Sequence, residues 1–421
     1  MAQPGTIGKN DEDDNHDHYH LLQYCFLSTK NQHKRMDQVL TIVHVTMCCL
    51  SLTHTLTLDG LRPMQLQDRL TTLFSKTKTP ECRALIAEHM GYFVNALATE
   101  VGLPFTDFEL QNECPEEVYD LENLPEGMHL GHIQNRTYQP EDGEYVDADD
   151  LTLCYGILTH EDPASTIRLI EALYEPGHSF VVHVDGKEMS DETHRVLTAY
   201  AKSSGKEHVH VLPDPYRVRV NWGGFNMVNA TIQILQYALA VETTNREPLH
   251  FHKFVHIAST SYPLVSNVRI RQTIASYPVD ANMMHVIMKP TDPYPGSWHY
   301  FVECDDAVHR IYRLSPLTSA TNGADVYTTS QWFIASRQFA QYLADQRPGT
   351  FSRDFLDYLK HVVVADEAYF GTVLRNTAFC TTHHNWNFLH LLFDRYVEQL
   401  QTRDGACALR GSLWFRLLDT D

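Results

Sequence analysis

An alternation of apolar strand, amphipathic helix and apolar strand most constrains what this chain can fold into. Leu151–Leu158 is a nearly continuous apolar run, Pro163–Tyr174 carries apolar residues at helical spacing, and Ser179–Val184 is a second apolar run. Two buried strands joined by a helix form the unit of a parallel sheet with right-handed crossovers. We therefore predict an α/β domain with a Rossmann-like, mostly parallel central sheet that is flanked by helices.

The alternation of strands and helices continues along the chain. The further predicted elements are a strand at His208–Leu212, a helix at Asn226–Leu239, a strand at His252–Ala258 and a helix at Asn267–Tyr277. Because each apolar run has strand length and each periodic stretch has helix length, the whole region is expected to form one sheet with its helices.

Polar residues follow the first two predicted strands directly. Thr159 and His160 come after the first strand, and Asp185 comes after the second. Ligands of parallel sheets bind beyond the carboxyl ends of the strands. Asp185 is therefore a candidate for hydrogen bonding to a nucleotide base or ribose. The alternative is an aspartate that only forms the turn before Gly186.

A segment rich in arginine and glycine, Arg217–Gly224, follows the third predicted strand. Its arginines suit contact with phosphate or with an acidic acceptor. Gly223 and Gly224 allow a positive φ or a close approach of the backbone to a ligand.

An acidic pair stands in the segment Val362–Asn376, which reads VVVADEAYFGTVLRN. Asp366 and Glu367 precede apolar residues at helical spacing, so both acids are expected in the first turn of a helix. One interpretation is that they are stabilised by the positive end of the helix dipole. The other is that one carboxylate is a general base, which has to be held firmly and aimed at the proton that it removes.

Charge and cysteine content narrow the classes of ligand. The chain has 421 residues and a net charge of −20, from 53 acidic against 33 basic residues, which argues against a nucleic-acid partner. Nine cysteines are scattered without a CxxC pair, so a structural zinc site is not expected. The odd number leaves at least one thiol free or intermolecular, and disulfide pairing cannot be deduced from spacing.

The N-terminal third is predicted to contain a tail, a membrane anchor and a stem. Residues 1–38 are expected to be a disordered cytoplasmic tail. Val39–Leu58 lacks Asp, Glu, Lys and Arg, has the length of a bilayer span, and follows basic residues, which together predict a type II signal anchor. Two histidines and five threonines in this stretch support the alternative of a buried soluble helix. Residues 59–150 are expected to be a helical stem and an acidic linker, with a glycosylation sequon at Asn135.

Several segments together resemble one enzyme family. In chain order these are HVD at 183–185, VNWGGFNMV at 220–228, SYPL at 261–264, TSQWFIASRQF at 329–339 and ADEAYFGTVLRN at 365–376. They resemble the core-2/I-branching glycosyltransferase family, which includes N-acetylglucosaminyltransferases, peptide O-xylosyltransferases and plant-type glucuronosyltransferases. The resemblance implies a GT-A type fold over residues 151–400, with a C-terminal tail at 401–421.

The resemblance also assigns roles to single residues. It makes Glu367 the general base and Asp366 its neighbour, as an acceptor-binding residue or a helix cap. It places Asp185 at the uracil or ribose of a UDP-sugar. The other residues that it assigns are Thr159, His160, Trp222 and Gly223 to the nucleotide-sugar pocket, and Trp332 to the side of the glycan or glycoprotein acceptor.

The sequence departs from the family after Asn385-Trp386-Asn387. Xylosyltransferase-like members carry a basic pair there for the leaving diphosphate, whereas this chain has Phe388-Leu389-His390. Arg395 is the nearest remaining candidate. An Asp-x-Asp motif after an internal strand is absent, so we expect no metal cofactor.

The resemblance implies a Golgi membrane protein with a lumenal catalytic domain. It implies transfer of xylose, N-acetylglucosamine or glucuronic acid with inversion. The alternative is a catalytically inactive carbohydrate-binding or scaffold protein with the same fold, which the missing basic pair favours and the presence of Glu367 and Asp185 disfavours.

Overall fold

The computed structural model describes residues 71–99, 110, 113–114, 143–241, 248–288, 299–313, 323–391 and 413–415. The chain divides into two units, Met1–Leu103 and Pro104–Asp421. In the first unit, helix α4 (Pro80–Thr99) buries Ile86 and Met90. None of the helices in the described ranges combines the length and apolarity that a membrane span needs. Val39–Leu58, Asn135 and Arg395 lie outside the described residues.

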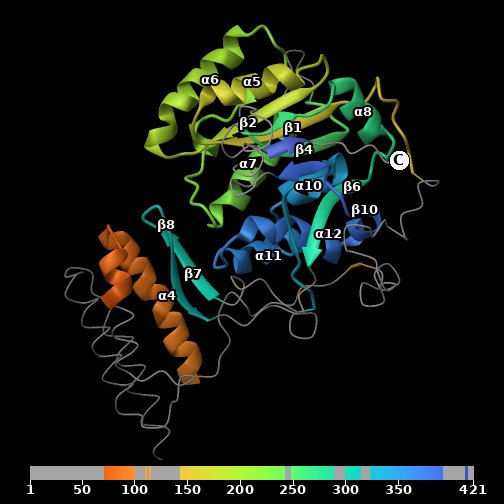
Figure 1. Cartoon of the computed structure of the whole chain (residues 1–421). Helices are drawn as coiled ribbons and strands as arrows, with labels where there is room; N and C mark the ends of the chain where they lie inside the picture. The colour runs from red at the N-terminus through yellow and green to blue at the C-terminus, as the bar shows by residue number, and fades with distance from the viewer. Residues whose placement is uncertain are drawn as a thin grey trace, which may run out of the picture. The chain divides into compact units, whose positions relative to one another are not determined.

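A seven-stranded sheet organises the second unit (Figure 1). Its strand order is β10–β6–β9–β4–β1–β2–β3. The strands are β1 Leu153–Thr159, β2 Ser179–Val184, β3 Val209–Val211, β4 Lys253–Ala258, β6 Asn282–Met288, β9 Thr328–Ser336 and β10 His383–His384. Only β9 runs antiparallel to its neighbours, β4 and β6. The prediction of a mostly parallel α/β sheet of GT-A type is therefore confirmed.

The order of the strands reverses at β1. β2 pairs with one edge of β1 and β4 with the other, both in parallel, so that Leu158 lies opposite His183 and Ala258. A reversal of this kind leaves a crevice at the carboxyl ends of the central strands, where ligands of doubly wound sheets bind. Thr159 is the last residue of β1, and Asp185 directly follows β2, at this edge.

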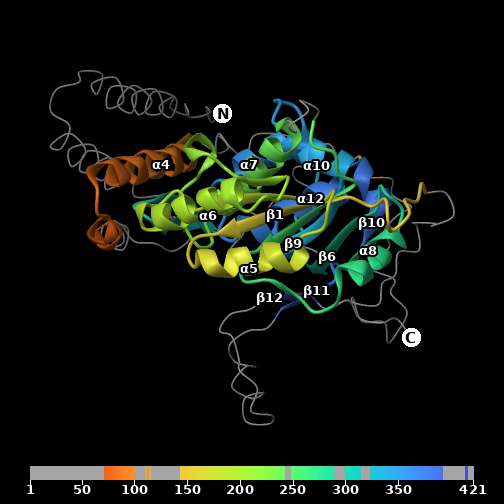
Figure 2. The same ribbon diagram turned by 90° about the horizontal axis from the view of Figure 1, so that it is seen from above.

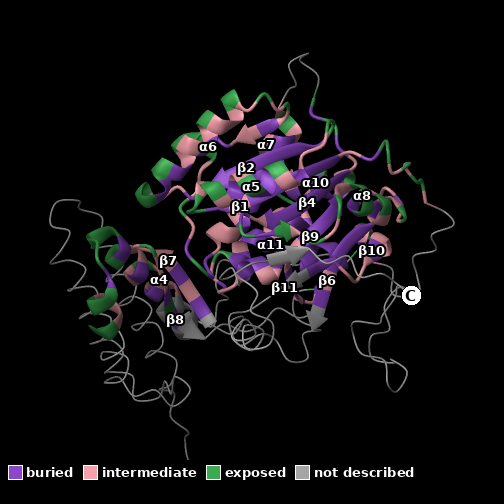
Figure 3. Cartoon of the chain, turned by 45° about the horizontal axis from the view of Figure 1, so that its top comes forward, coloured by how far each residue is buried: buried purple, intermediate pink, exposed green. Residues whose placement is uncertain are grey.

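Helices cover both faces of the sheet (Figures 1 and 2). One face carries α5 Pro163–Leu173, α6 Asp191–Ser203 and α8 Asn267–Ala275, whose apolar residues join a cluster with the strands. The other face carries α7 Asn226–Ala240, α10 Arg337–Ala344 and α12 Tyr369–Asn376, and α11 Phe351–Leu359 contacts α12. The central strands β1, β2 and β4 between these layers are almost wholly buried (Figure 3).

Two pieces of chain outside the predicted 151–400 domain attach to this unit. A disulfide joins Cys114 to Cys380, and the backbone N–H of Glu113 donates to the carbonyl of Asn376. β12 (Leu413–Phe415) completes a small sheet with β5 (Tyr262–Pro263) and β11 (Leu389–Leu391). Non-local attachments of this kind have no signal in a local sequence pattern.

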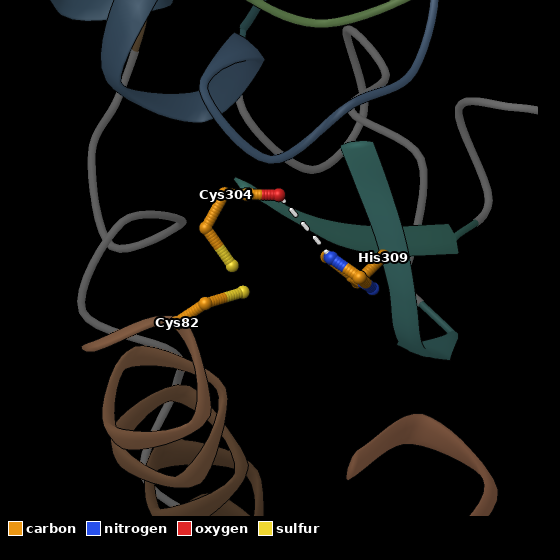
Figure 4. A group of neighbouring side chains, drawn as sticks. All are labelled: Cys82, Cys304 and His309. Carbon is orange, nitrogen blue, oxygen red and sulfur yellow. Dashed lines mark hydrogen bonds between the residues drawn. The ribbon is translucent and has the colours of Figure 1, made fainter. Parts of the chain in front are cut away.

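A separate hairpin is formed by β7 (His299–Cys304) and β8 (Ala307–Arg313). Asp305 and Asp306, the two turn residues, have φ values of 55° and 60°, as a two-residue turn between right-twisted strands requires. Nε2 of His309 lies 3.3 Å from the carbonyl oxygen of Cys304 (Figure 4). Cys304 is disulfide-bonded, so its sulfur is not available as a thiolate ligand. Cys154, in contrast, is a free and buried thiol.

Candidate functional site

Asp185 connects the end of β2 to the loop that follows β3. Its backbone N–H donates to the carbonyl of Thr159 at 2.9 Å, which brings the ends of β1 and β2 together. Oδ1 of Asp185 accepts hydrogen bonds from the backbone N–H groups of Lys187 at 3.0 Å and Val220 at 3.1 Å. Nζ of Lys187 lies 3.9 Å from Oδ2. Asp185 therefore does form the local turn, and it also fixes the loop that starts at Val220.

The two residues at the end of β1, Thr159 and His160, differ in how accessible their side chains are. The hydroxyl of Thr159 donates to the carbonyl of Glu161 at 3.2 Å and accepts from Thr166 at 3.2 Å, so its hydrogen bonds are internal. The His160 side chain is exposed beside Glu161. The carbonyl of His160 accepts from Ser190 at 2.7 Å, which anchors the backbone of this strand end.

The loop that contains Trp222 and Gly223 contacts the acidic segment. The carbonyl of Gly223 accepts a hydrogen bond from the N–H of Val364 at 2.7 Å. Gly223 has a φ of +72°, a conformation that favours glycine, and a Cβ at this position would crowd the Val363 side chain at 3.2 Å. The Trp222 side chain is 83% exposed, which leaves its ring available to a ligand at the surface.

The acids Asp366 and Glu367 lie in a single 3-10 turn, η8 (Ala365–Glu367), and α12 begins only at Tyr369. The prediction that both acids lie in the first turn of the helix is therefore wrong, because they lie in a separate 3-10 turn directly before it. Val364, which precedes this turn, is left-handed, with φ 57° and ψ 44°. For a β-branched residue this conformation costs roughly 1–3 kcal/mol, and such strain concentrates at functional sites.

The two carboxyl groups have different environments. Asp366 is 2% exposed, and its Oδ1 has no hydrogen-bond partner among the described residues. Burial and, secondly, the charge of Glu367 raise the pKa of Asp366 to about 7. Glu367 is half-buried, and burial raises its pKa above the usual value of 4.5. Glu367 is thus the acid of the pair that keeps access to solvent.

Trp332 on β9 is held by the segment after β10. Nδ2 of Asn387 donates to the carbonyl of Trp332 at 2.9 Å and to the hydroxyl of Ser330 at 3.0 Å. The indole packs against the ring of His256, with 5.0 Å between ring centroids. The same strand reaches the acidic turn, because the hydroxyl of Thr329 donates to the carbonyl of Glu367 at 3.3 Å.

The predicted residues therefore belong to one connected region. Hydrogen bonds lead from Thr159 to Asp185 and from Asp185 to the loop at Val220. They continue from Gly223 to the turn that carries Glu367, and from this turn to β9. The structure brings together the segments of all predicted site residues except Arg395, which lies outside the described ranges.

Sequence reasoning missed Glu303 on β7. Its carboxylate accepts hydrogen bonds from Nδ2 of Asn221 at 3.0 Å and from the backbone N–H of Asn226 at 3.3 Å. Burial raises the pKa of Glu303, and hydrogen bonds from the two asparagines partly oppose this effect. The one signal in the sequence is an acid within the apolar run HYFVEC, which is weak evidence without the fold.

The two arginines of the same loop have different partners. The guanidinium of Arg217 donates to the carbonyl of Asp185 at 2.7 Å and to the carboxylates of Asp191 and Asp214. Nη2 of Arg219 donates to Asp306 at the tip of the hairpin, at 3.0 Å, and the side chain is largely exposed. Arg219 is thus the more available of the two cations for an anionic ligand.

Comparison with known proteins gives a coherent result. The family model for the Core-2/I-branching enzyme matches residues 153–409, more than half of the chain. Human xylosyltransferase 2 is 26% identical over 256 residues, which cover 59% of this chain and 27% of the relative. Drosophila melanogaster xylosyltransferase oxt is 25% identical over 229 residues, covering 53% and 24% of the two chains. The β-glucuronosyltransferase GlcAT14A of Arabidopsis thaliana is 27% identical over 232 residues, covering 51% and 48%. The match thus spans less than half the length of each of these relatives.

Proposed function

The chain belongs to the Core-2/I-branching enzyme family, and from this premise we propose that it is an inverting glycosyltransferase. It would transfer a sugar from a UDP-sugar to a hydroxyl group of a glycan or glycoprotein. The observation that carries the proposal is the loop between Val220 and Gly223, which hydrogen-bonds at one end to Asp185 and at the other to the acidic turn. This loop would thereby connect the proposed nucleotide ligand, Asp185, with the turn that carries the proposed base, Glu367.

Glu367 is the proposed general base. An acceptor hydroxyl is a poor nucleophile until its proton is being removed, and a carboxylate about 3 Å away can accept this proton as the new C–O bond forms. The raised pKa makes Glu367 a stronger base than an exposed glutamate. One displacement of UDP by the hydroxyl oxygen inverts the anomeric carbon, so no second nucleophilic carboxylate is needed.

Asp185 is the proposed ligand for the uracil or ribose. It lies at the carboxyl edge of the sheet where the strand order reverses, and its Oδ1 is already fixed by two backbone N–H groups. A carboxylate that is held in this way is preorganised to accept hydrogen bonds from a nucleoside. Thr159 and His160 would shape the same end of the pocket.

Protein cations are proposed to neutralise the leaving diphosphate, with no metal ion required. Positively charged side chains aimed at the developing charge can supply this stabilisation. Arg395 is the candidate from the sequence, and Arg219 is an exposed candidate on the loop that contacts Asp185.

Xylose and glucuronic acid are the proposed first choices of donor sugar, because the similar proteins are named as xylosyltransferases and a glucuronosyltransferase. N-acetylglucosamine remains the third choice. Incubation with UDP-xylose, UDP-glucuronic acid and UDP-N-acetylglucosamine, with UDP release as the readout, tests the proposal. Release with none of the three, across a panel of glycan and peptide acceptors, would favour an inactive carbohydrate-binding protein instead.

A lumenal location in the Golgi, behind a signal anchor at Val39–Leu58, is also proposed. The disulfide between Cys114 and Cys380 supports an oxidising compartment. Carbonate extraction of the full chain and of a chain that starts at Asp59 tests the anchor. A full-length protein that is extracted with carbonate and lacks a glycan on Asn135 would contradict this part of the proposal.

A further inference from the structure

The side-chain amide of Asn221 has a fixed orientation. Its Nδ2 donates to Oε1 of Glu303 at 3.0 Å, and the same carboxylate accepts from the backbone N–H and Nδ2 of Asn226 at 3.3 and 3.4 Å. A carboxylate is an acceptor only, so it selects the amide nitrogen of Asn221 and turns the amide oxygen away. Glu303 thereby determines where Oδ1 of Asn221 lies.

That oxygen is buried. Asn221 is 7% exposed, and its Oδ1 makes no hydrogen bond within the part of the chain that the structure describes. A buried acceptor without a donor costs about 1–3 kcal/mol, and native proteins rarely leave one without a reason. A ligand hydroxyl that donates to Oδ1 would remove this cost.

The position of Asn221 indicates which ligand group this is. The preceding residue, Val220, donates its N–H to Asp185, the proposed nucleoside ligand. Gly223, two residues after Asn221, accepts from Val364 at the start of the turn that carries Glu367. In an inverting displacement the transferred sugar lies between the leaving nucleotide and the attacking hydroxyl. Asn221 lies between the corresponding protein groups along this loop.

The loop around Asn221 is also closely confined. A Cβ at Gly224 would lie 2.6 Å from the carboxyl carbon of Glu303, so only a glycine admits that carboxylate behind the loop. Because Glu303 contacts the loop from β7 and Val364 contacts it from the acidic turn, its position is set from two sides.

We propose that Oδ1 of Asn221 accepts a hydrogen bond from a hydroxyl group of the sugar being transferred, and that Glu303 is the positioning residue that orients the amide. The inference rests on the proposed function, because it needs Asp185 at the nucleotide and Glu367 at the acceptor. It assigns recognition of the donor sugar to a pair of residues that are 82 positions apart in the chain.

The test compares Asn221→Ala with Asn226→Ala in the full chain. Both variants remove an amide that donates to Glu303, but only the first removes the unpartnered oxygen. The KM for the preferred UDP-sugar and the inhibition constant of UDP alone are measured by UDP release. Asn221→Ala is expected to raise this KM by about tenfold or more, the usual effect of one lost hydrogen bond to a substrate hydroxyl, and to leave the inhibition constant of UDP unchanged. Asn226→Ala should change neither value.

Substitution of Glu303 tests the positioning role. Glu303→Ala releases the Asn221 amide and is expected to raise the KM for the preferred UDP-sugar. Glu303→Gln keeps an acceptor oxygen for Nδ2 of Asn221, so its KM should stay close to that of the wild type. Thermal unfolding followed by circular dichroism identifies variants that do not fold.

The outcomes separate the inference from the proposed function. An unchanged KM in a folded Asn221→Ala variant overturns the inference and leaves the proposed function intact. The same holds if the substitution raises the inhibition constant of UDP as much as it raises the KM for the UDP-sugar. A wild-type protein that releases UDP from none of the three UDP-sugars overturns the proposed function, and the inference with it.

Discussion

Asp185 and the pair Asp366–Glu367 are acids in loops of the same connected region, but their surroundings are opposite. Oδ1 of Asp185 accepts two backbone hydrogen bonds, and Lys187 lies close to the other oxygen. Oδ1 of Asp366 has no partner among the described residues, and burial raises the pKa of both Asp366 and Glu367.

The difference in surroundings suits one acid to ligand binding and the other to proton transfer. Hydrogen bonds and a nearby cation stabilise a carboxylate in one position, which suits a residue that recognises a ligand. Burial disfavours the charged form of a carboxylate and so raises its affinity for a proton, which suits a general base. The environments therefore support the division of roles that the motifs imply, with Asp185 for the nucleotide and Glu367 for the proton.

The largest expected effect is that of Glu367→Gln. Loss of a general base typically lowers turnover by about a hundredfold or more. The substitution keeps the shape of the side chain and leaves Asp185 and its loop untouched, so UDP affinity should not change. Turnover by UDP release and UDP affinity by calorimetry check the two halves of this prediction. Near-normal turnover in the variant would remove Glu367 from the mechanism and end the division of roles.

Asp366→Asn is expected to change how stability depends on pH. The pKa of Asp366 is about 7 in the folded protein and 3.8 for an unperturbed aspartate. The stability gained from the neutral acid is therefore fully present below pH 3.8 and is lost as the pH rises through about 7. An asparagine stays neutral, so the stability of the variant relative to the wild type should rise by about 2–3 kcal/mol between pH 5 and pH 8.

Urea unfolding at the two pH values measures this change. The comparison uses the change with pH in the difference in unfolding free energy between variant and wild type. The absolute difference is not used, because a buried asparagine amide changes the unfolding free energy by an amount that does not depend on pH. A difference between variant and wild type that is the same at pH 5 and pH 8 would show that Asp366 is ionised throughout, and the contrast with Asp185 would disappear.

Substitutions of Asp185 should act on UDP binding with a smaller effect. Asp185→Asn keeps an acceptor oxygen for the N–H groups of Lys187 and Val220 but removes the charge, so UDP affinity should fall by about tenfold, in line with hydrogen bonds to charged groups. Asp185→Ala also frees the loop and should weaken binding further. Calorimetry with UDP gives both values, and unchanged affinity in the folded alanine variant would exclude Asp185 from the nucleotide site.

The sequence predicted the part of this arrangement that depends on local patterns. Apolar runs and helical periodicity identified β1, β2 and β4, and the rule that ligands bind at strand ends selected Asp185. The role of Glu303 could not be predicted, because it depends on a hairpin that approaches Asn221 from 82 residues away. The left-handed conformation of Val364 also has no local signal, since a valine is among the residues least expected there.

Removal of divalent metal ions is expected to have the smallest effect. Oδ1 of Asp366, which has no hydrogen-bond partner among the described residues, has a second physical explanation, which is a cation bound between the two acids in the active protein. If a metal ion were bound at Asp366 and Glu367, it would favour their ionised forms and reverse the direction of both pKa shifts. We expect the rate of UDP release to be unchanged by EDTA, since protein cations are proposed to carry the charge of the diphosphate. Loss of activity with EDTA and its recovery with Mn²⁺ would contradict this. Asp185, whose Oδ2 lies 3.9 Å from Nζ of Lys187, would then have to be tested as a ligand beside the acidic pair.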